Sequence, residues 1–382
     1  MPSEALTKVE RIYQDRSNRA KALKKNGRKI FGYFCGLTPV ELITAAGIVP
    51  FEITGKIKES TGEADAYLEA IACNYLRNCL GRALRGEYSF LDGLVIPHAC
   101  DILVKLYDIW KYNVKPPYAH FINTPHTRSN PSHQFFRAEL GTFKISLEKL
   151  IGREITEKEL RVSIALHNKN RALVRQLYEF RKPNPPLVLG SEVLKIISAV
   201  LSLPVDESNE LLKELIRELK ERKDRPQNKP GRLLIYGSKL DNAELIEMIE
   251  ASGAHVVMDD LCFGYRPFAY DVETKGDPLK NIGDHYLDKI PCPRFCADTV
   301  VAHQADLQAR FGHLLDYAKD YNINGVIIQI ITYCDPYAFD LPELREFFKT
   351  AGLPVLVLEH DYTMLAIQRL KTQVQAFLEI TV

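Results

Sequence analysis

The sequence has little net charge and no long hydrophobic run. Its 382 residues carry a formal net charge of +1 at pH 7, so no global field attracts nucleic acid or a membrane surface. No apolar stretch approaches the ~18 residues of a membrane-spanning helix. The opening residues, MPSEALTKVERIYQDR, are charged from the start and lack the apolar core of a signal peptide. We therefore expect a cytoplasmic protein that binds neither nucleic acid nor membranes.

Motifs for nucleotides and for compact metal sites are also absent. The chain contains no GxxxxGK phosphate loop and no GxGxxG turn, which excludes a recognisable nucleotide site of its own. It also lacks the run of closely spaced cysteines that is typical of ferredoxins. Its eight cysteines are scattered, and a reducing cytoplasm favours thiols or metal ligands over disulfides. Any metal site must therefore be assembled from distant segments.

Four of the cysteines follow short apolar runs. The run GVIIQIITYCDP, from Gly325 to Pro336, ends at Cys334, and three similar runs place cysteines in the same way: GRKIFGYFCGLTP with Cys35, FLDGLVIPHACD with Cys100 and GAHVVMDDLCFG with Cys262. Runs this short and rich in Val and Ile are typical of strands buried on both faces of a parallel sheet. Ligands of open α/β sheets bind beyond the carboxyl ends of the strands, so we expect these thiols at the functional edge of the fold.

The other four cysteines carry weaker signals. Cys73 and Cys79 lie on a predicted amphipathic helix from Ala64 to Leu84, where a thiol serves as core or as ligand. Cys292 and Cys296 belong to the loop PCPRFC, which its prolines keep out of regular structure; one of this pair is a ligand candidate and the other incidental. A single cysteine is more often a small buried hydrophobe, so the repeated strand-end position is what favours a metal site.

Histidines and aromatic residues near these cysteines are secondary candidates. His98 is close to Cys100 and could imitate a Cys–His pair, although packing is the commoner role. His360 ends the apolar run LPVLVLEHD; one hypothesis is a proton relay or substrate contact, and the other is a structural histidine. Three aromatic residues flank the thiols and form either cavity walls or ordinary core: Tyr33, Phe34 and Tyr333.

The order of strand and helix signals predicts an α/β protein with two Rossmann-like parallel-sheet domains and an intervening helical domain. We place the amino-terminal α/β domain at residues 1–131, the helical domain at 132–228 and the carboxyl-terminal α/β domain at 229–382. The charged segment RKDRPQNKPGR, broken by two prolines, is the clearest linker. After the first strand, Thr38 and Pro39 predict a helix with Thr38 as its N-cap.

These segments resemble the 2-hydroxyacyl-CoA dehydratase and benzoyl-CoA reductase superfamily along essentially the whole chain. The blocks that carry the resemblance are GYFCGLTPVELITAAGIVPFEITG, ACNYLRNCLG, PHACD, and TYCDP with the terminal QRLKTQVQAFLE. The resemblance implies [4Fe–4S]-type clusters between α/β and helical domains. It also implies low-potential electrons from a separate ATP-hydrolysing activator, which would explain the missing phosphate loop. Three cysteines match the family pattern that ligates one cubane: Cys73, Cys100 and Cys334.

The chain departs from the minimal dehydratase pattern by its additional thiols at Cys35, Cys262 and Cys292. In this respect it resembles the double-cubane cluster proteins of the same superfamily, which are homodimers. By that resemblance each cubane of an [8Fe-9S] cluster would take three thiolates. Cys79 is the substitute for Cys73 in this assignment, and Cys296 is the substitute for Cys292.

The resemblance leads us to expect a double-cubane iron–sulfur reductase that reduces small substrates with electrons from the activator. The alternative is a [4Fe–4S] subunit of a 2-hydroxyacyl-CoA dehydratase or benzoyl-CoA reductase, which would need a different partner chain and bind an acyl thioester beside its cubane. Two further hypotheses remain open: an electron carrier or cluster-delivery scaffold without turnover, and a cluster-free binding protein with buried thiols.

Overall fold

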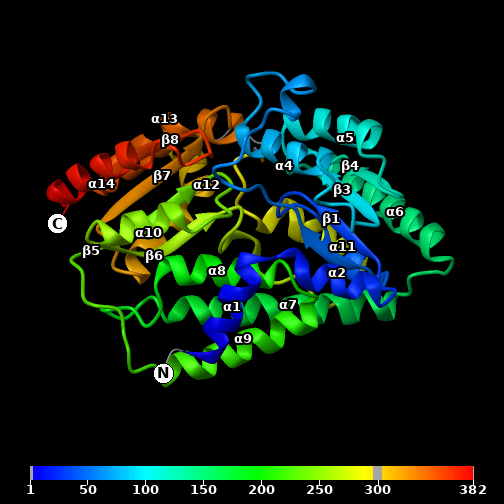
Figure 1. Cartoon of the computed structure of the whole chain (residues 1–382), viewed down its shortest axis with the longest axis horizontal. Coiled ribbons are helices and arrows are strands. Elements are labelled where there is room, and N and C mark those ends of the chain that lie inside the picture. The colour runs from blue at the N-terminus through cyan, green and yellow to red at the C-terminus, as the bar shows by residue number, and fades with distance from the viewer. Residues whose placement is uncertain (1–2, 296–302, 382) are drawn as a thin grey trace.

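The computed structural model describes residues 3–295 and 303–381 and contains two four-stranded sheets, both parallel (Figure 1). The first sheet has the order β2-β1-β3-β4 and the second the order β6-β5-β7-β8. The strands of the first sheet are β1 Ile30–Tyr33, β2 Val49–Glu52, β3 Gly93–Pro97 and β4 Ala119–Ile122. Those of the second are β5 Gly231–Gly237, β6 Ala254–Leu261, β7 Gly325–Ile331 and β8 Val355–His360. The predicted α/β class is confirmed.

Helices surround both sheets. Those that belong with the first are α2 Ser17–Lys25, α3 Val40–Ala45, α4 Asn74–Leu84 and α5 Asp101–Asn113. A run without strands follows: α6 Asn130–Ile151, α7 Glu157–Glu179, α8 Gly190–Val200 and α9 Val205–Lys220. The remaining helices are α1 Glu4–Gln14, α10 Glu244–Ala251, α11 Pro278–Asp284, α12 His303–Asp320, α13 Asp335–Thr350 and α14 Ile367–Thr381. In Figure 1, α7, α8 and α9 lie together with α1 beneath the two sheets.

Three hydrophobic clusters show how these layers are joined. One cluster fills one face of the first sheet with side chains of α2, α4 and α5. A second fills the opposite face with α3, α6 and α11, so a helix from the carboxyl-terminal part of the chain packs against the first sheet. The third combines the second sheet with α1, α8 and α9. The helical segment thus divides its packing between the two sheets, and the predicted domain boundaries remain predictions. Within the described residues no helix is long and apolar enough to span a bilayer.

Two local predictions were wrong. The helix expected from residue 64 begins only at Asn74, with Cys73 as its N-cap, and a short 3₁₀ turn occupies Ala64–Ala66. Leu68 and Ala72 are buried, so tertiary packing overrides the helical periodicity there. The helix after β1 begins at Val40 with Pro39 at the N-cap. Thr38 does not cap it, because its hydroxyl donates back to the Phe34 carbonyl oxygen at 2.7 Å.

Both sheets have the same strand order, and therefore the same topological switch point. Chain connections leave β1 and β3 in opposite directions across the first sheet, and β5 and β7 do the same in the second. Parallel α/β sheets bind ligands beyond the carboxyl ends of these central strands. The residues that follow these four strands include Cys35, Cys100, Lys239 and Cys334.

Gly237, the last residue of β5, allows the chain to turn toward Lys239. Its φ is 153°, and a Cβ added there would lie 1.9 Å from the Gln329 carbonyl oxygen of β7. Gly237→Ala is therefore expected to lower the free energy of unfolding by about 3 kcal/mol or more, because backbone on the neighbouring strand must move. Urea unfolding followed by circular dichroism measures this loss. Gly276→Ala is the matched control, since Gly276 also has a positive φ but no atom within 4 Å of the added Cβ; equal losses in both variants would contradict the prediction.

Candidate functional site

A single cavity between the two sheets collects the thiols of the strand ends. We call it the thiol cavity. Its wall contains all six cysteines of the primary ligand prediction: Cys35, Cys73, Cys100, Cys262, Cys292 and Cys334. The rest of the wall is mainly apolar or aromatic, with Lys239 and Asp335 as its charged residues. Segments separated by hundreds of residues therefore present their sulfur atoms to one space.

Each thiol is placed by the end of a strand or the start of a helix. Cys35 follows β1 with a left-handed backbone (φ 66°), and Cys262 follows β6. Cys73, Cys100 and Cys334 are the N-cap residues of α4, α5 and α13. The amino end of a helix carries a partial positive charge and unpaired amide groups. Such positions favour the thiolate form of a cysteine, which is the form that binds metals.

The six thiols fall into two groups of neighbours. Burial is the main cause that raises the pKa of Cys35 well above its usual range, followed by the adjacent Cys262 and Cys292. Burial also raises the pKa of Cys292 to about 11, with Cys262 as the next cause. Because such interactions weaken with distance, these residues form one group. We call Cys35, Cys262 and Cys292 the first triad.

The second triad consists of Cys73, Cys100 and Cys334. Burial raises the pKa of Cys73 to about 12, and Cys100 is the next cause. Burial likewise raises the pKa of Cys334 well above its usual range, followed by Cys73, Cys100 and then Cys262. Cys334 therefore neighbours both members of its own triad and also Cys262. The two triads meet at this point.

The donor set fits an iron–sulfur group. Buried thiols with raised pKa values are costly to ionise alone, and a bound metal supplies the compensating positive charge while its ligands lose their protons. Several thiolates in an apolar space select iron–sulfur clusters, zinc or copper(I) rather than hard cations. Cationic side chains also favour ionised thiols: Lys239 favours the thiolate of Cys35, and Arg266 followed by Arg294 favours that of Cys292.

The substitutes and secondary candidates lie elsewhere. Cys79 is fully buried and does not line the thiol cavity, and Cys296 lies outside the described residues. The His98 Nδ1 atom lies 3.1 Å from Asn123 Oδ1, and no hydrogen bond joins His98 to Cys100 among the described residues. Phe34 and Tyr333 line the thiol cavity, as one hypothesis expected, whereas Tyr33 lines a different one.

His360 is a buried residue at the end of β8 and does not line the thiol cavity. Its Nε2 atom lies 2.9 Å from Gln329 Oε1, and its Nδ1 atom accepts a hydrogen bond from the Tyr362 amide at 3.1 Å. Burial lowers its pKa to about 4, so the ring is neutral near pH 7. With both nitrogens engaged, these contacts favour the structural alternative over a proton relay.

Sequence reasoning missed three residues: Lys239 and Tyr337, which line the thiol cavity, and Arg266, which contacts Cys262. Lys239 follows β5 in the same way that the cysteines follow their strands, so its strand-end position was an available signal. Arg266 and Tyr337 lie a few residues after Cys262 and Cys334. Arg266 contacts a thiol four residues away. Nothing in the one-dimensional pattern shows that Tyr337 approaches the same sulfur atom, because that contact joins segments 75 residues apart.

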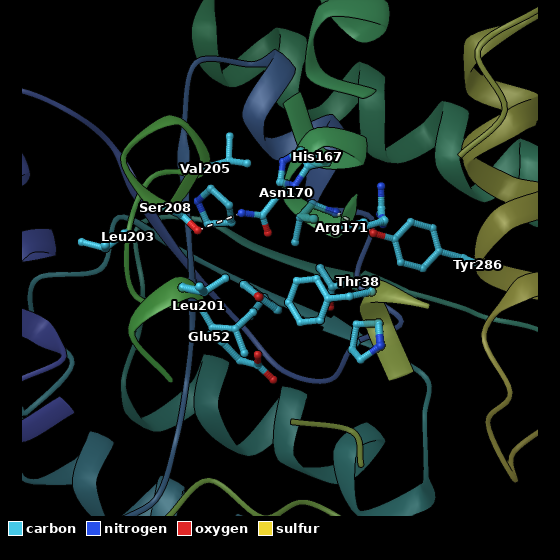
Figure 2. A pocket seen from close by; sticks show the side chains of 17 residues that line it. Thr38, Glu52, His167, Asn170, Arg171, Leu201, Leu203, Val205, Ser208 and Tyr286 are labelled. Atoms are coloured by element: carbon cyan, nitrogen blue, oxygen red, sulfur yellow. Dashed lines mark hydrogen bonds between the residues drawn. The ribbon is translucent and has the colours of Figure 1, made fainter. Parts of the chain in front are cut away.

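A second cavity lies on the other side of the loop that follows β1, between Thr38, Glu52 and α7 (Figure 2). Several of its polar side chains have partners within the protein: Asn170 donates to Ser208 Oγ at 2.8 Å, and Arg171 forms an ion pair with the buried Glu41 behind the wall. Figure 2 shows Asn170 directed toward Ser208. Glu52 also forms an ion pair with Lys239 of the thiol cavity. Because these polar groups are paired within the protein, we interpret the second cavity as part of the packing between segments and not as a ligand site.

Comparisons with known proteins agree with this arrangement. Residues 35–381 match the family model described as 2-hydroxyglutaryl-CoA dehydratase, D-component. A benzoyl-CoA reductase subunit of Thauera aromatica is 28% identical, and the match covers 98% of this chain and 97% of that protein. The (R)-phenyllactyl-CoA dehydratase beta subunit of Clostridium sporogenes is 24% identical over 94% of this chain and 93% of its own.

A third relative, also matched over nearly its whole length, is a subunit of another dehydratase. The beta subunit of (R)-2-hydroxyglutaryl-CoA dehydratase from Acidaminococcus fermentans is 24% identical over 93% of each chain. The family model covers far more than half of the residues, and the superfamily resemblance seen in the sequence is confirmed. The chain therefore belongs to the 2-hydroxyglutaryl-CoA dehydratase D-component family, whose members named above are subunits of dehydratases and of a reductase.

Proposed function

We propose that this protein is an iron–sulfur reductase that holds an [8Fe-9S] double-cubane cluster in the thiol cavity. It would reduce small substrates with low-potential electrons from a separate ATP-hydrolysing iron–sulfur activator, and it would act as a homodimer in the cytoplasm. The observation that carries the proposal is the meeting of two cysteine triads in one cavity. A single cubane needs no more than one of them.

The two triads supply six thiol ligands, three for each cubane, and all six line the same cavity. Cys73, Cys100 and Cys334 correspond to the three-cysteine pattern of the dehydratases, and the first triad adds an equal set within the same chain. The closeness of Cys334 to Cys262 supports two metal groups in contact. When bound, such a cluster supplies one-electron transfer at a potential set by charge, hydrogen bonds and exposure.

The chain's own residues prepare the cavity for this chemistry. Phe34, Leu76 and Leu103 contribute apolar wall, which excludes water and strengthens electrostatic interactions inside. Lys239 provides a positive charge there: its Nζ lies 4.3 Å from the centroid of the Phe263 ring and pairs with Glu52. We propose that this side chain offsets negative charge on the thiolates.

A second candidate function is favoured by the names of the relatives. Those relatives are subunits of dehydratases and of benzoyl-CoA reductase, and they match over nearly their whole length. In this alternative the protein is a [4Fe–4S] subunit with a different partner chain and an acyl thioester as substrate. Only the second triad would then bind a cubane, and the first triad would have no metal to hold.

Iron and acid-labile sulfide per chain, measured after anaerobic purification, separate these functions. We expect about eight iron atoms with slightly more sulfide than iron, and a homodimer by light scattering. About four iron atoms and a need for a second chain would favour the dehydratase subunit. Absence of iron would overturn both and favour a cluster-free binding protein. A loaded protein that shows no ATP-dependent turnover with any activator would instead be an electron carrier or scaffold.

A further inference from the structure

Cys262 is bonded differently from the other thiols of the cavity. Its Sγ atom lies 2.8 Å from the Tyr337 hydroxyl and 3.5 Å from Arg266 Nη1. The remaining five cavity thiols receive hydrogen bonds from backbone amides, such as Leu37 for Cys35 and Leu103 for Cys100. Within the described part of the chain, none of those five has a side-chain donor.

The direction of these hydrogen bonds follows from which atoms of Arg266, Tyr337 and Cys262 can donate and which can accept. Arg266 has only donors, so its Nη1 donates to the Tyr337 oxygen. The hydroxyl hydrogen of Tyr337 is then free to point at Cys262, and a thiolate sulfur can only accept. The hydrogen bond from Arg266 polarises the Tyr337 hydroxyl, so the hydroxyl donates a stronger hydrogen bond to the sulfur. Such charge-assisted bonds are stronger than those between neutral groups.

Arg266 is held in this place by a rigid, buried frame. Its Nε donates to Asp260 Oδ1 at 2.8 Å, and its Nη2 donates to the Asp260 carbonyl oxygen at 2.6 Å. The other carboxylate oxygen, Oδ2, lies 3.0 Å from His313 Nε2. The buried ion pair between Asp260 and Arg266 thus fixes the guanidinium with its positive end toward Cys262.

We propose that Tyr337 and Arg266 are positioning residues that raise the reduction potential of the metal centre through the sulfur of Cys262. This inference rests on the proposed function, since it requires a cluster in the thiol cavity. A reduced cluster carries more negative charge, and hydrogen bonds to its sulfur ligands stabilise that charge. The triad that contains Cys262 would therefore accept an electron more readily than an identical site without the Tyr337 hydroxyl.

Tyr337→Phe tests the proposal because it removes only the hydroxyl that reaches Cys262. We expect unchanged iron and sulfide content and a more negative midpoint potential in a redox titration followed by electron paramagnetic resonance. At a fixed potential, the ratio of reduced to oxidised centre should fall by up to tenfold, which corresponds to ~59 mV for a one-electron couple. Tyr333→Phe is the matched control, since it removes a hydroxyl from the same cavity wall without a hydrogen bond to sulfur among the described residues.

Each outcome has a defined meaning. A full iron content with an unchanged midpoint in Tyr337→Phe, or an equal shift in Tyr333→Phe, would overturn the role of Tyr337. If Tyr337→Phe loses its metal, electron–nuclear double resonance of the reduced protein with its tyrosines labelled with ¹⁷O at the hydroxyl decides instead. Because backbone amides carry no such label, a ¹⁷O coupling to the centre in the Tyr333→Phe background supports the proposal, and its absence overturns it. Wild type without iron would reject the proposed function itself, and the inference with it.

Discussion

Cys262→Ala is expected to lose about half of the bound iron, and Cys100→Ala a similar amount from the other triad. The physical reason is that removal of one thiolate leaves one cubane with too few ligands, while the ligands of the other triad are unchanged. Iron and acid-labile sulfide are measured on protein purified anaerobically. Electron paramagnetic resonance of the reduced protein then shows whether the remaining iron forms a single type of cluster. Reductive turnover should be lost in both variants.

Cys79→Ala is the matched control for this experiment. Cys79 lies on α4, which Cys73 caps, but its side chain is fully buried outside the thiol cavity. Its removal deletes a small buried group and no ligand, so iron content should equal that of the wild type. Loss of iron in Cys79→Ala with retention in Cys262→Ala would refute the assignment of the triads. Retention of all iron in Cys262→Ala would support the second triad as the sole ligand set.

Glu41→Gln is expected to cost about 3–5 kcal/mol of stability, because it leaves a buried arginine without its counter-charge. Glu41, on α3, is fully buried and forms an ion pair with Arg171 of α7. Its other oxygen accepts a hydrogen bond from the Tyr286 hydroxyl at 2.8 Å. The carboxylate thus joins three segments of the chain. The midpoint of urea unfolding, with an unchanged slope, measures the loss.

The pH dependence of the same variant follows from the pKa of Glu41. Burial would raise this pKa, but Arg171, His167 and His285 together outweigh burial and lower the value from 4.5 to about 2. A carboxyl with a lowered pKa contributes stability above its unfolded value and loses that contribution as pH falls through the folded value. The stability difference between wild type and Glu41→Gln should therefore shrink as pH falls from about 4.5 toward 2.

An exposed ion pair on the same helix provides the control. Glu157 and Arg161 of α7 lie 3.4 Å apart with largely exposed side chains, and such pairs contribute little to stability because water and salt screen them. Glu157→Gln should leave the unfolding midpoint nearly unchanged. If Glu41→Gln were equally mild at neutral pH, the buried pair would have no structural role.

The separation of Cys73 from Cys79 illustrates what sequence reasoning leaves open. Both cysteines lie in one short block, and either could be the ligand by position in the motif. In the structure Cys73 is the N-cap, outside the helical backbone of α4, whereas Cys79 lies inside the helix. Only Cys73 lines the thiol cavity, so the two sulfur atoms lie on different sides of α4. Which side faces the other sheet depends on how α4 packs, and that information lies in distant residues.

Lys239, Arg266 and Tyr337 show a second limit. Each is an ordinary polar residue in the sequence, and its significance comes from partners far along the chain, such as Glu52 for Lys239 and Cys262 for Tyr337. The helix start at Cys73 was missed for a related reason. Burial of Leu68 and Ala72 against other segments outweighs their helical spacing, and local patterns carry no record of it.

The sequence by itself determined the α/β class and the strand-end placement of four cysteines, because short Val- and Ile-rich runs specify buried parallel strands and end where their apolar residues end. It also determined the family, through blocks that extend along the whole chain. Only the tertiary structure decided that six thiols share one cavity, and that Cys262 alone among these six receives a side-chain hydrogen bond within the described residues. Such contacts join segments far apart in the chain, and the facing of two sheets across a common helical layer creates them.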